Sequence, residues 1–185
     1  MSDSLATGAK LTPETFADFV SRLKYHRRGE GVNDHCTADA FFVVQRKRLV
    51  SGIDPEYTDQ LMVYCDDWQW FSIQEYWDDL EADGRAELNK KAQDWCSSQF
   101  MKSGESDQWY LIGQLENHTV TGYQWEWEHV NSHFTKEAAE AFIKRKAHDY
   151  SGLRVYVDSQ CWSWEFNTII NAIIDGRLAL SEVQP

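Results

Sequence analysis

Hydrophobic residues recur along this chain at two different periods, and the change of period restricts the fold to one that combines helices with strands. Between residues 166 and 174 they return every three to four positions, as on one face of a helix. Between residues 120 and 130 they alternate with polar residues, with Tyr123, Trp125 and Trp127 on one side, which is the period of a half-buried strand. Along the whole chain these patterns predict the order α-β-β-α-α-β-β-α-β-α. We expect an α+β fold in which helices pack on a mixed or mostly antiparallel sheet.

Capping residues and glycines mark where the expected helices begin and end. Thr12, followed by a proline, is placed to cap a first helix that Gly29 ends. Ser72, three residues before a glutamate, starts another helix, which Gly84 is expected to end. The expected helices cover residues 13–28, 72–82, 85–99, 135–147 and 163–175. The expected strands cover residues 40–49, 60–65, 109–115, 120–130 and 153–158.

The length and composition of the chain indicate one globular domain. A chain of 185 residues buries roughly 70% of the surface that it exposes when unfolded. It has only three prolines and no long Gly/Ser-rich linker. We expect a single α+β domain over residues 1–185, with residues 1–11 as a flexible N-terminal segment and residues 177–185 as a C-terminal tail.

The N-terminal residues and the cysteines favour a cytoplasmic protein. Residues 1–10 lack the apolar core of a secretory signal, and the longest apolar runs are far too short to cross a membrane. The four cysteines are widely spaced, so we expect reduced thiols, although their even number would allow two disulfides. They are Cys36, Cys65, Cys96 and Cys161.

The net charge of −12 is concentrated in one part of the sequence. Residues 1–48 sum to +2, residues 49–135 to −13 and residues 136–185 to −1. Between Leu49 and Gly84 there are ten Asp and Glu and no Lys or Arg. A negative field of this kind repels nucleic acids and anionic lipids and attracts a basic partner.

Histidine and cysteine positions give little support to a metal site or a nucleophile, and we expect neither a metal nor a cofactor. His129 and His133 are four residues apart but straddle the end of an expected strand, where this spacing does not bring two rings to one face. Cys36 follows His35, yet adjacent side chains of an extended segment point apart. We therefore expect this pair to pack before the strand that begins at Ala40 rather than to catalyse.

Two pairs of adjacent carboxylates lie near tryptophans, a pattern found in sugar-hydrolysing clefts, where aromatic rings stack on sugars and two acids act on the bond. The pairs are Asp66–Asp67 and Asp78–Asp79, beside Trp68, Trp70 and Trp77. A chain with thirty acidic residues also produces such neighbours by composition. A solvated acidic face is therefore the preferred interpretation, and a carboxylate-dependent hydrolase with an aromatic-lined cleft is the alternative.

Four acids crowd the expected end of the helix that begins at Ser72, where the helix dipole is already negative. They are Asp78, Asp79, Glu81 and Asp83. Stability alone favours Lys or Arg there, so the placement points to function. Among the nine tryptophans, Trp95, Trp125 and Trp127 are expected in the core, whereas Trp68 and Trp70 cannot both be buried in an extended segment.

Two stretches resemble small uncharacterised phage and prophage proteins. The front of that family is similar to residues 35–45 (HCTADAFFVVQ) with 57–59 (YTD), and its back half to residues 134–143 (FTKEAAEAFI) with 155–159 (VYVDS). The resemblance implies a phage accessory role in the host cytosol, such as counter-defence of the anti-CRISPR kind, and it supplies no catalytic residues. The acidic stretch 66–83 departs most from the family pattern.

We therefore hypothesise a non-enzymatic phage accessory protein that binds and inhibits a basic host protein that handles nucleic acid. It would act without contacting nucleic acid or a membrane itself. The expected partner-binding residues are Asp66, Asp67, Trp68, Trp70, Asp78, Asp79, Glu81 and Asp83. A further alternative is an adaptor that recruits its partner through the basic residues between Arg22 and Arg28 or between Arg46 and Arg48.

Overall fold

The computed structural model describes residues 4–181 and divides the chain into two compact units. Residues 1–48 and 127–185 form one, which we call the terminal unit, and residues 49–126 form the other, the central unit. Each is described by itself. The expectation of one domain over residues 1–185 stays a prediction.

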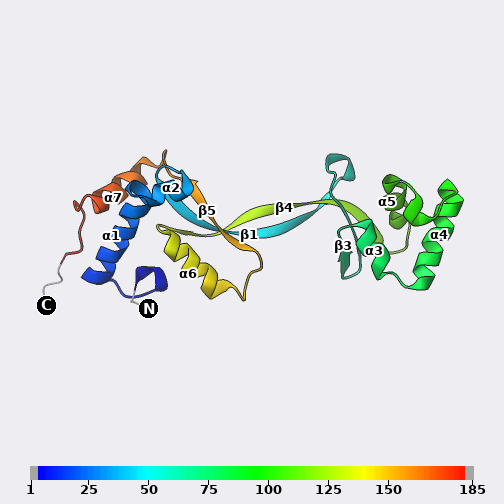
Figure 1. Ribbon diagram of the computed structural model, residues 1–185, viewed down its shortest axis with the longest axis horizontal. Coiled ribbons are helices and arrows are strands. Elements are labelled where there is room, and N and C mark those ends of the chain that lie inside the picture. The colour runs from blue at the N-terminus through cyan, green and yellow to red at the C-terminus, as the bar shows by residue number, and fades with distance from the viewer. Residues whose placement is uncertain (1–3, 182–185) are drawn as a thin grey trace. The chain divides into compact units, whose positions relative to one another are not determined.

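The described residues form an α+β fold, as predicted (Figure 1). The helices are α1 (Pro13–Arg28), α2 (Gly31–His35), α3 (Ile73–Asp79), α4 (Ala82–Cys96), α5 (Glu105–Gly113), α6 (Lys136–Lys146) and α7 (Trp164–Ile174). The strands are β1 (Ala40–Ile53), β2 (Leu61–Cys65), β3 (Trp68–Trp70), β4 (His118–His133) and β5 (Leu153–Ser159), in the sheet order β3-β2-β4-β1-β5. Strand β2 pairs antiparallel with β3 and β4, and β1 pairs antiparallel with β5.

The terminal unit has its core on the β1–β5 pair and between α1 and α7. Phe42 and Val44 of β1 are fully buried and pack with Ala139 of α6. Leu23 of α1 and Ile170 of α7 form a second cluster. The expected inner faces are confirmed at Leu23, Phe42, Val44, Ile170 and Ile174, which are buried. Ile169, also part of the apolar stripe of α7, is 48% exposed.

Polar groups of the terminal unit pair with one another. The Arg27 guanidinium is almost fully buried and donates to Asp39 Oδ1 at 2.7 Å and to Asn167 Oδ1 at 2.6 Å. Arg28 forms an ion pair with Asp175, and Arg46 and Arg48 both pair with Glu128. The basic clusters that an adaptor would present are therefore largely engaged within this unit.

The segment before α1 has defined structure from Ser4 onward, where a flexible segment was expected. Ser4 is buried and donates its hydroxyl to Asp18 Oδ2 of α1 at 2.8 Å, and Leu5–Thr7 form a short 3-10 helix. Residues 1–3 lie outside the described residues, as do residues 182–185 of the expected tail. Residues 177–181 contain no helix or strand.

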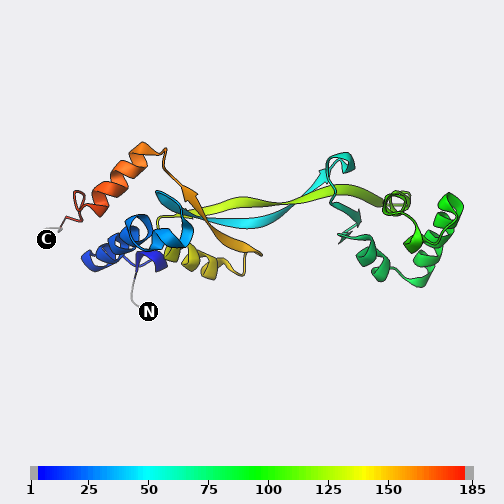
Figure 2. The same cartoon turned by 45° about the horizontal axis from the view of Figure 1, so that its top comes forward.

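The central unit encloses its own core beneath strand β2. Val63, Tyr76, Leu88, Phe100 and Ile112 are all essentially inaccessible to solvent. Helices α4 and α5 lie next to each other (Figures 1 and 2). Helices α3, α4 and α5 contribute to this core, and they carry eight of the sixteen acidic residues of the central unit.

Two predictions for the central unit are wrong. Residues 109–115, expected as a strand, belong to α5 up to Gly113, because Trp109 and Ile112 are buried at helical spacing against the core. Gly84 does not end a helix. Helix α3 stops at Asp79, and Gly84 lies in the first turn of α4, where a Cβ would approach Leu80 Cδ2 to 3.2 Å. None of the helices described is long and apolar enough to cross a membrane.

Candidate functional site

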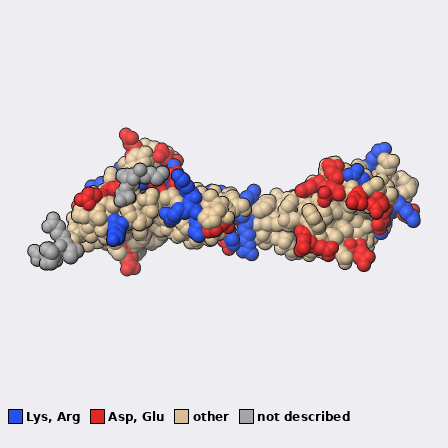
Figure 3. Space-filling view, turned by 90° about the horizontal axis from the view of Figure 1, so that it is seen from below, with Lys and Arg blue, Asp and Glu red and all other residues tan. Residues whose placement is uncertain are grey.

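The central unit carries the entire net charge of the chain. Its residues 49–126 include sixteen Asp and Glu and four Lys and Arg, a sum of −12, whereas the terminal unit has fourteen of each kind and sums to zero. In Figure 3 red side chains predominate over the central unit, at the right of the view. The division of charge along the sequence therefore coincides with the division of the structure into units.

Ion pairing differs between the two units in the same way. Among residues 4–181, ten of the eleven ion pairs lie in the terminal unit. The central unit has one, between Lys91 and Glu87 at 3.7 Å on α4. Apart from Glu87, the carboxylates of the central unit form no ion pair within the described chain, which keeps their field available to another molecule.

All six carboxylates expected to bind a partner are exposed, and none forms an ion pair within the described residues. Asp66 and Asp67 form the two-residue turn between β2 and β3, where Asp66 adopts a left-handed φ of +52°. Trp68 follows directly and is 68% exposed. The hairpin therefore presents two carboxylates and an indole together, and we call these three residues the hairpin tip.

Trp70 and Asp79 link β3 to the end of α3. The indole Nε1–H of Trp70 donates to Asp79 Oδ2 at 3.0 Å, and its ring packs edge-on against Tyr76 with centroids 5.0 Å apart. Trp70 is half-buried and Trp68 exposed, as the sequence required of an extended segment. The indole of Trp70 thus positions Asp79, and Trp68 is the exposed tryptophan of this hairpin.

Of the four acids expected at one helix end, only Asp78 and Asp79 end α3, whereas Glu81 is the N-cap of α4 and Asp83 lies in its first turn, where the helix dipole favours acids. The end of α3 is compensated by a cation that sequence reasoning missed. Arg85 of α4 donates its Nε–H to Trp77 O at 3.0 Å and an Nη2–H to Asp78 O at 2.9 Å, and its guanidinium lies over the Trp77 ring. Both carbonyl groups lie in the last turn of α3, where a helix lacks main-chain donors for its oxygens. Trp77 O also accepts the Leu80 N–H at 3.3 Å. Because Arg85 binds main-chain oxygens, the carboxylates of Asp78 and Asp79 remain unpaired by any cation in the described chain.

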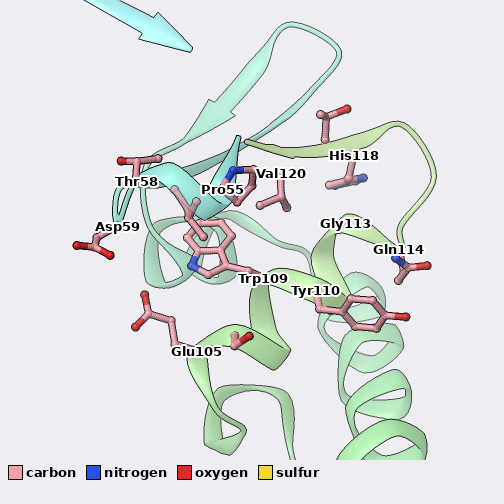
Figure 4. A pocket seen from close by; sticks show the side chains of 13 residues that line it. Pro55, Thr58, Asp59, Glu105, Trp109, Tyr110, Gly113, Gln114, His118 and Val120 are labelled. Atoms are coloured by element: carbon pink, nitrogen blue, oxygen red, sulfur yellow. The ribbon is translucent and has the colours of Figure 1, made fainter. Parts of the chain in front are cut away.

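The six carboxylates lie outside the cavities of the central unit. A cavity of about 780 Å³ is bounded by β2, β4 and α5, with the Trp109 indole in its wall and Tyr110 at its edge (Figure 4). The carboxylates that line it are Asp59 and Glu105. The pairs at residues 66–67 and 78–79, on which the hydrolase alternative depended, line neither this cavity nor a second one of about 570 Å³.

His118 lies at one side of the 780 Å³ cavity with both ring nitrogens bonded. Its Nδ1 donates to Glu116 O at 2.7 Å, and its Nε2 lies 2.9 Å from the Tyr76 hydroxyl. Burial raises the pKa of Tyr76 to about 12, so this phenol keeps its proton at neutral pH. Both ring nitrogens are occupied, and the cavity gains no free base from this histidine.

His35, which precedes Cys36, is engaged in local hydrogen bonds. The Nδ1 of His35 accepts the Thr37 N–H at 3.2 Å, and its Nε2 lies 3.2 Å from His26 O, while burial lowers its pKa. Both nitrogens of this ring are used locally, so it does not act on Cys36. Within residues 4–181 no group of three or more His, Cys, Asp or Glu gathers where it could hold a metal ion.

The three tryptophans expected in the core are exposed. Trp95 is 56%, Trp125 45% and Trp127 39% accessible. The Trp95 indole donates to Asp107 Oδ1 at 3.0 Å and lies against Tyr110, while the Arg154 guanidinium lies 3.8 Å above Trp127. Polar partners at the surface hold Trp95 and Trp127, and Trp125 lies near the Phe71 ring, contacts that the alternation of residue types could not reveal.

Asp59, Glu105, Trp109 and Tyr110 were not expected to act together from the sequence. Comparison with protein-family models, with curated proteins and with solved structures found no match to this chain. The geometry and charge of the molecule therefore carry the functional argument.

Proposed function

We propose that this chain is a non-enzymatic binding protein that occupies a basic surface of another protein through exposed residues of its central unit, which we call the acidic face: Asp66, Asp67, Trp68, Asp78, Asp79, Glu81 and Asp83, with Trp70 beneath them. The observation that carries the proposal is that the unit holds all of the net charge and that, among its described carboxylates, only Glu87 forms an ion pair. A field of this kind raises the rate of encounter with a basic surface and makes the encounter sensitive to salt.

The hairpin tip gives the acidic face an anchor. Trp68 exposes 68% of its surface beside two carboxylates, and tryptophans in such positions contribute a large share of the binding free energy at protein interfaces. Its neighbours supply charge, and the indole supplies apolar area. The expected partner surface is therefore basic with an apolar recess.

Local hydrogen bonds hold the surface in one arrangement before a partner arrives. Ser72 Oγ accepts the Glu75 N–H at 3.1 Å, and the Glu75 carboxylate accepts the Phe71 N–H at 2.8 Å, which fixes the start of α3. The bond between Trp70 and Asp79 fixes its end. A surface ordered in advance loses less conformational entropy on binding.

The proposed class of partner follows from competition between the acidic face and nucleic acid for the same basic groove. A negative face that fits a basic groove displaces the nucleic acid that such a groove otherwise holds, so the partner is a protein that handles nucleic acid, and binding inhibits it. The resemblance to phage proteins extends the proposal to a host defence protein as the target, as for an anti-CRISPR. Release of nucleic acid from the captured partner on addition of this chain would support that step, and a ternary complex would contradict it.

Capture at two salt concentrations tests the proposal. The immobilised chain is exposed to nuclease-treated bacterial lysate at about 50 mM and about 500 mM salt, and captured proteins are identified. The test variant reverses to Lys four carboxylates that lie outside the Trp70–Asp79 bond: Asp66, Asp67, Glu81 and Asp83. We expect this variant to lose the basic proteins that the natural chain retains at low salt.

A matched variant separates the acidic face from total charge. It reverses to Lys four exposed carboxylates of the terminal unit that form no ion pair in the described chain: Glu30, Asp34, Asp158 and Glu165. Both variants change the net charge equally. Equal loss of capture in both would contradict a specific role for the central unit, and unchanged capture by the first variant would end the proposal.

A further inference from the structure

We infer that the 780 Å³ cavity between β2, β4 and α5 is a receptor for an arginine side chain of the partner. This inference rests on the proposed function, because it names the group by which a basic partner would enter the central unit. The volume lies within the roughly 300–1,000 Å³ typical of ligand sites.

The wall of the cavity is aromatic and aliphatic. Trp109 is 93% buried yet lines the cavity. Leu61 of β2 and Val120 of the adjacent strand β4 complete an apolar wall. Figure 4 shows the Trp109 indole at the cavity, with Tyr110 further along α5. An indole face attracts a cation that is placed above it, and a guanidinium also stacks there through its flat surface.

Two carboxylates with no partner of their own lie at this cavity. Asp59 precedes β2 and Glu105 begins α5, and both are exposed. In the described chain neither carboxylate forms a hydrogen bond or an ion pair. Together with Leu61 and Trp109 they also line the 570 Å³ cavity, so the two carboxylates lie where the two cavities meet.

The remaining lining residues argue against other occupants. No Lys or Arg lines the cavity, and both nitrogens of His118 are already bonded, so no cationic group is present to hold an anion. A purely apolar ligand would displace water from two carboxylates and give them nothing in return. A guanidinium satisfies both features at once, since it donates several N–H groups to carboxylates and stacks on an indole.

The aromatic surface continues outward from the cavity, which favours the side chain of a protein over a free small cation. Tyr110 is 46% exposed and lies against Trp95, with ring centroids 4.6 Å apart. The Trp95 indole donates to Asp107. A polypeptide whose arginine enters the cavity can lay its neighbouring residues on this pair.

The test uses the intact chain and arginine in its simplest peptide form. N-acetyl-arginine methylamide is titrated into the isotopically labelled chain, and the indole N–H signal of Trp109 is followed by NMR after identification through a Trp109→Phe variant. N-acetyl-citrulline methylamide, which has the same shape and no charge, is the matched ligand. We expect the arginine compound to shift the Trp109 signal in a saturable manner and the citrulline compound to leave it in place.

Charge-neutral substitutions locate the effect. Asp59→Asn with Glu105→Gln should weaken arginine binding by about tenfold or more, because the cavity loses its two carboxylates while the side chains keep their size and shape. Glu81→Gln with Asp83→Asn removes the same charge outside the cavity and should change binding by less than about twofold. Equal weakening by both pairs would show attraction by the general field alone and would overturn the inference, as would a Trp109 signal that does not move.

The two proposals fail separately. Arginine binding at Trp109 is measured without any protein partner. If no binding is found, the cavity is not an arginine receptor, and the capture experiment still decides the proposed function. Loss of capture in the Lys-reversed variant with unaltered capture in the Asp59→Asn, Glu105→Gln variant supports the acidic face and contradicts entry of a partner arginine into the cavity.

Discussion

Arg85 donates its Nε–H to the main-chain oxygen of Trp77 at 3.0 Å, so the first cation after a stretch of thirty-six residues without one satisfies a helix end and leaves the carboxylates alone. Its second contact, from Nη2–H to Asp78 O at 2.9 Å, is also to a main-chain oxygen. The central unit thus uses a positive charge to stabilise its fold while its surface stays negative.

Arg85→Ala should destabilise the central unit by about 1–3 kcal/mol, since two charge-assisted hydrogen bonds and the contact with Trp77 are lost together. Arg85→Lys should cost less stability than Arg85→Ala but more than none, because an ammonium group keeps the charge and cannot reproduce the forked contact. Urea unfolding measures both. Lys90→Ala, an exposed change on the same helix, should stay within about 0.5 kcal/mol of the natural chain. A loss of stability in Lys90→Ala as large as that in Arg85→Ala would contradict the role given to the Arg85 contacts.

Salt should stabilise the central unit. Its net charge of −12 is largely uncompensated, so its carboxylates repel one another in the folded state. Raising NaCl from about 50 mM to about 500 mM screens that repulsion and should raise its unfolding temperature. Differential scanning calorimetry provides the measurement. The variant with Lys at residues 66, 67, 81 and 83 should show a clearly smaller response, and an equal response would mean that these carboxylates do not repel one another appreciably.

Gly122→Ala should destabilise the chain by about 1–3 kcal/mol. A Cβ at Gly122 would overlap Thr58 Cγ2 and lie 2.8 Å from Ile53 O, a main-chain atom that cannot move aside freely. Gly113→Ala is the control, because its nearest neighbour would be Val120 Cγ2 at 3.6 Å, an ordinary contact. Thermal unfolding of both variants gives the comparison. A neutral Gly122→Ala would show that the loop at Thr58 shifts at little cost.

Glu137 should make the terminal unit sensitive to acid. The hydrogen bond from the His26 ring lowers the pKa of this carboxyl below its ordinary value of 4.5. Its contribution to stability is therefore complete above about pH 4.5 and is lost as the pH falls through the lowered value. Denaturant unfolding at about pH 5 and about pH 3 should show a smaller loss of stability in Glu137→Gln than in the natural chain. Glu140→Gln, an exposed change on the same helix, should keep the full loss.

Helix starts were the most predictable feature of the fold, because the signal for each lies within four residues. Thr12, Ser72 and Thr135 each accept a main-chain N–H three residues on, as their sequence patterns predicted. The inner faces of β1 and α1 were equally readable, since Phe42 and Leu23 follow the period of their elements.

The errors arose where tertiary contacts outweighed local preference. Residues 109–112 have the composition of a strand, yet they form part of α5, from which Trp109, Leu111 and Ile112 enter the core. Trp95 stands on the expected inner face of its helix but turns to Asp107, a residue that becomes its neighbour only when α4 and α5 pack together. No pattern within a single segment carries that information.

The acidic face could be predicted and the cavity could not. Charge composition depends on residue identity alone, so the concentration of acids was visible before any fold was known. Asp59 and Glu105 lie far apart in the sequence and line the same cavity only because α5 packs beside β2 and β4. The sequence contains both residues and no sign of their proximity.

The central unit is an insertion within the terminal unit, because residues on both sides of it build the same charge-balanced body. Under the proposed function, recognition and scaffolding occupy different stretches of the chain. Substitutions between residues 49 and 126 are then expected to alter partner binding while the pairing of β1 with β5 and the buried Arg27 network stay as they are.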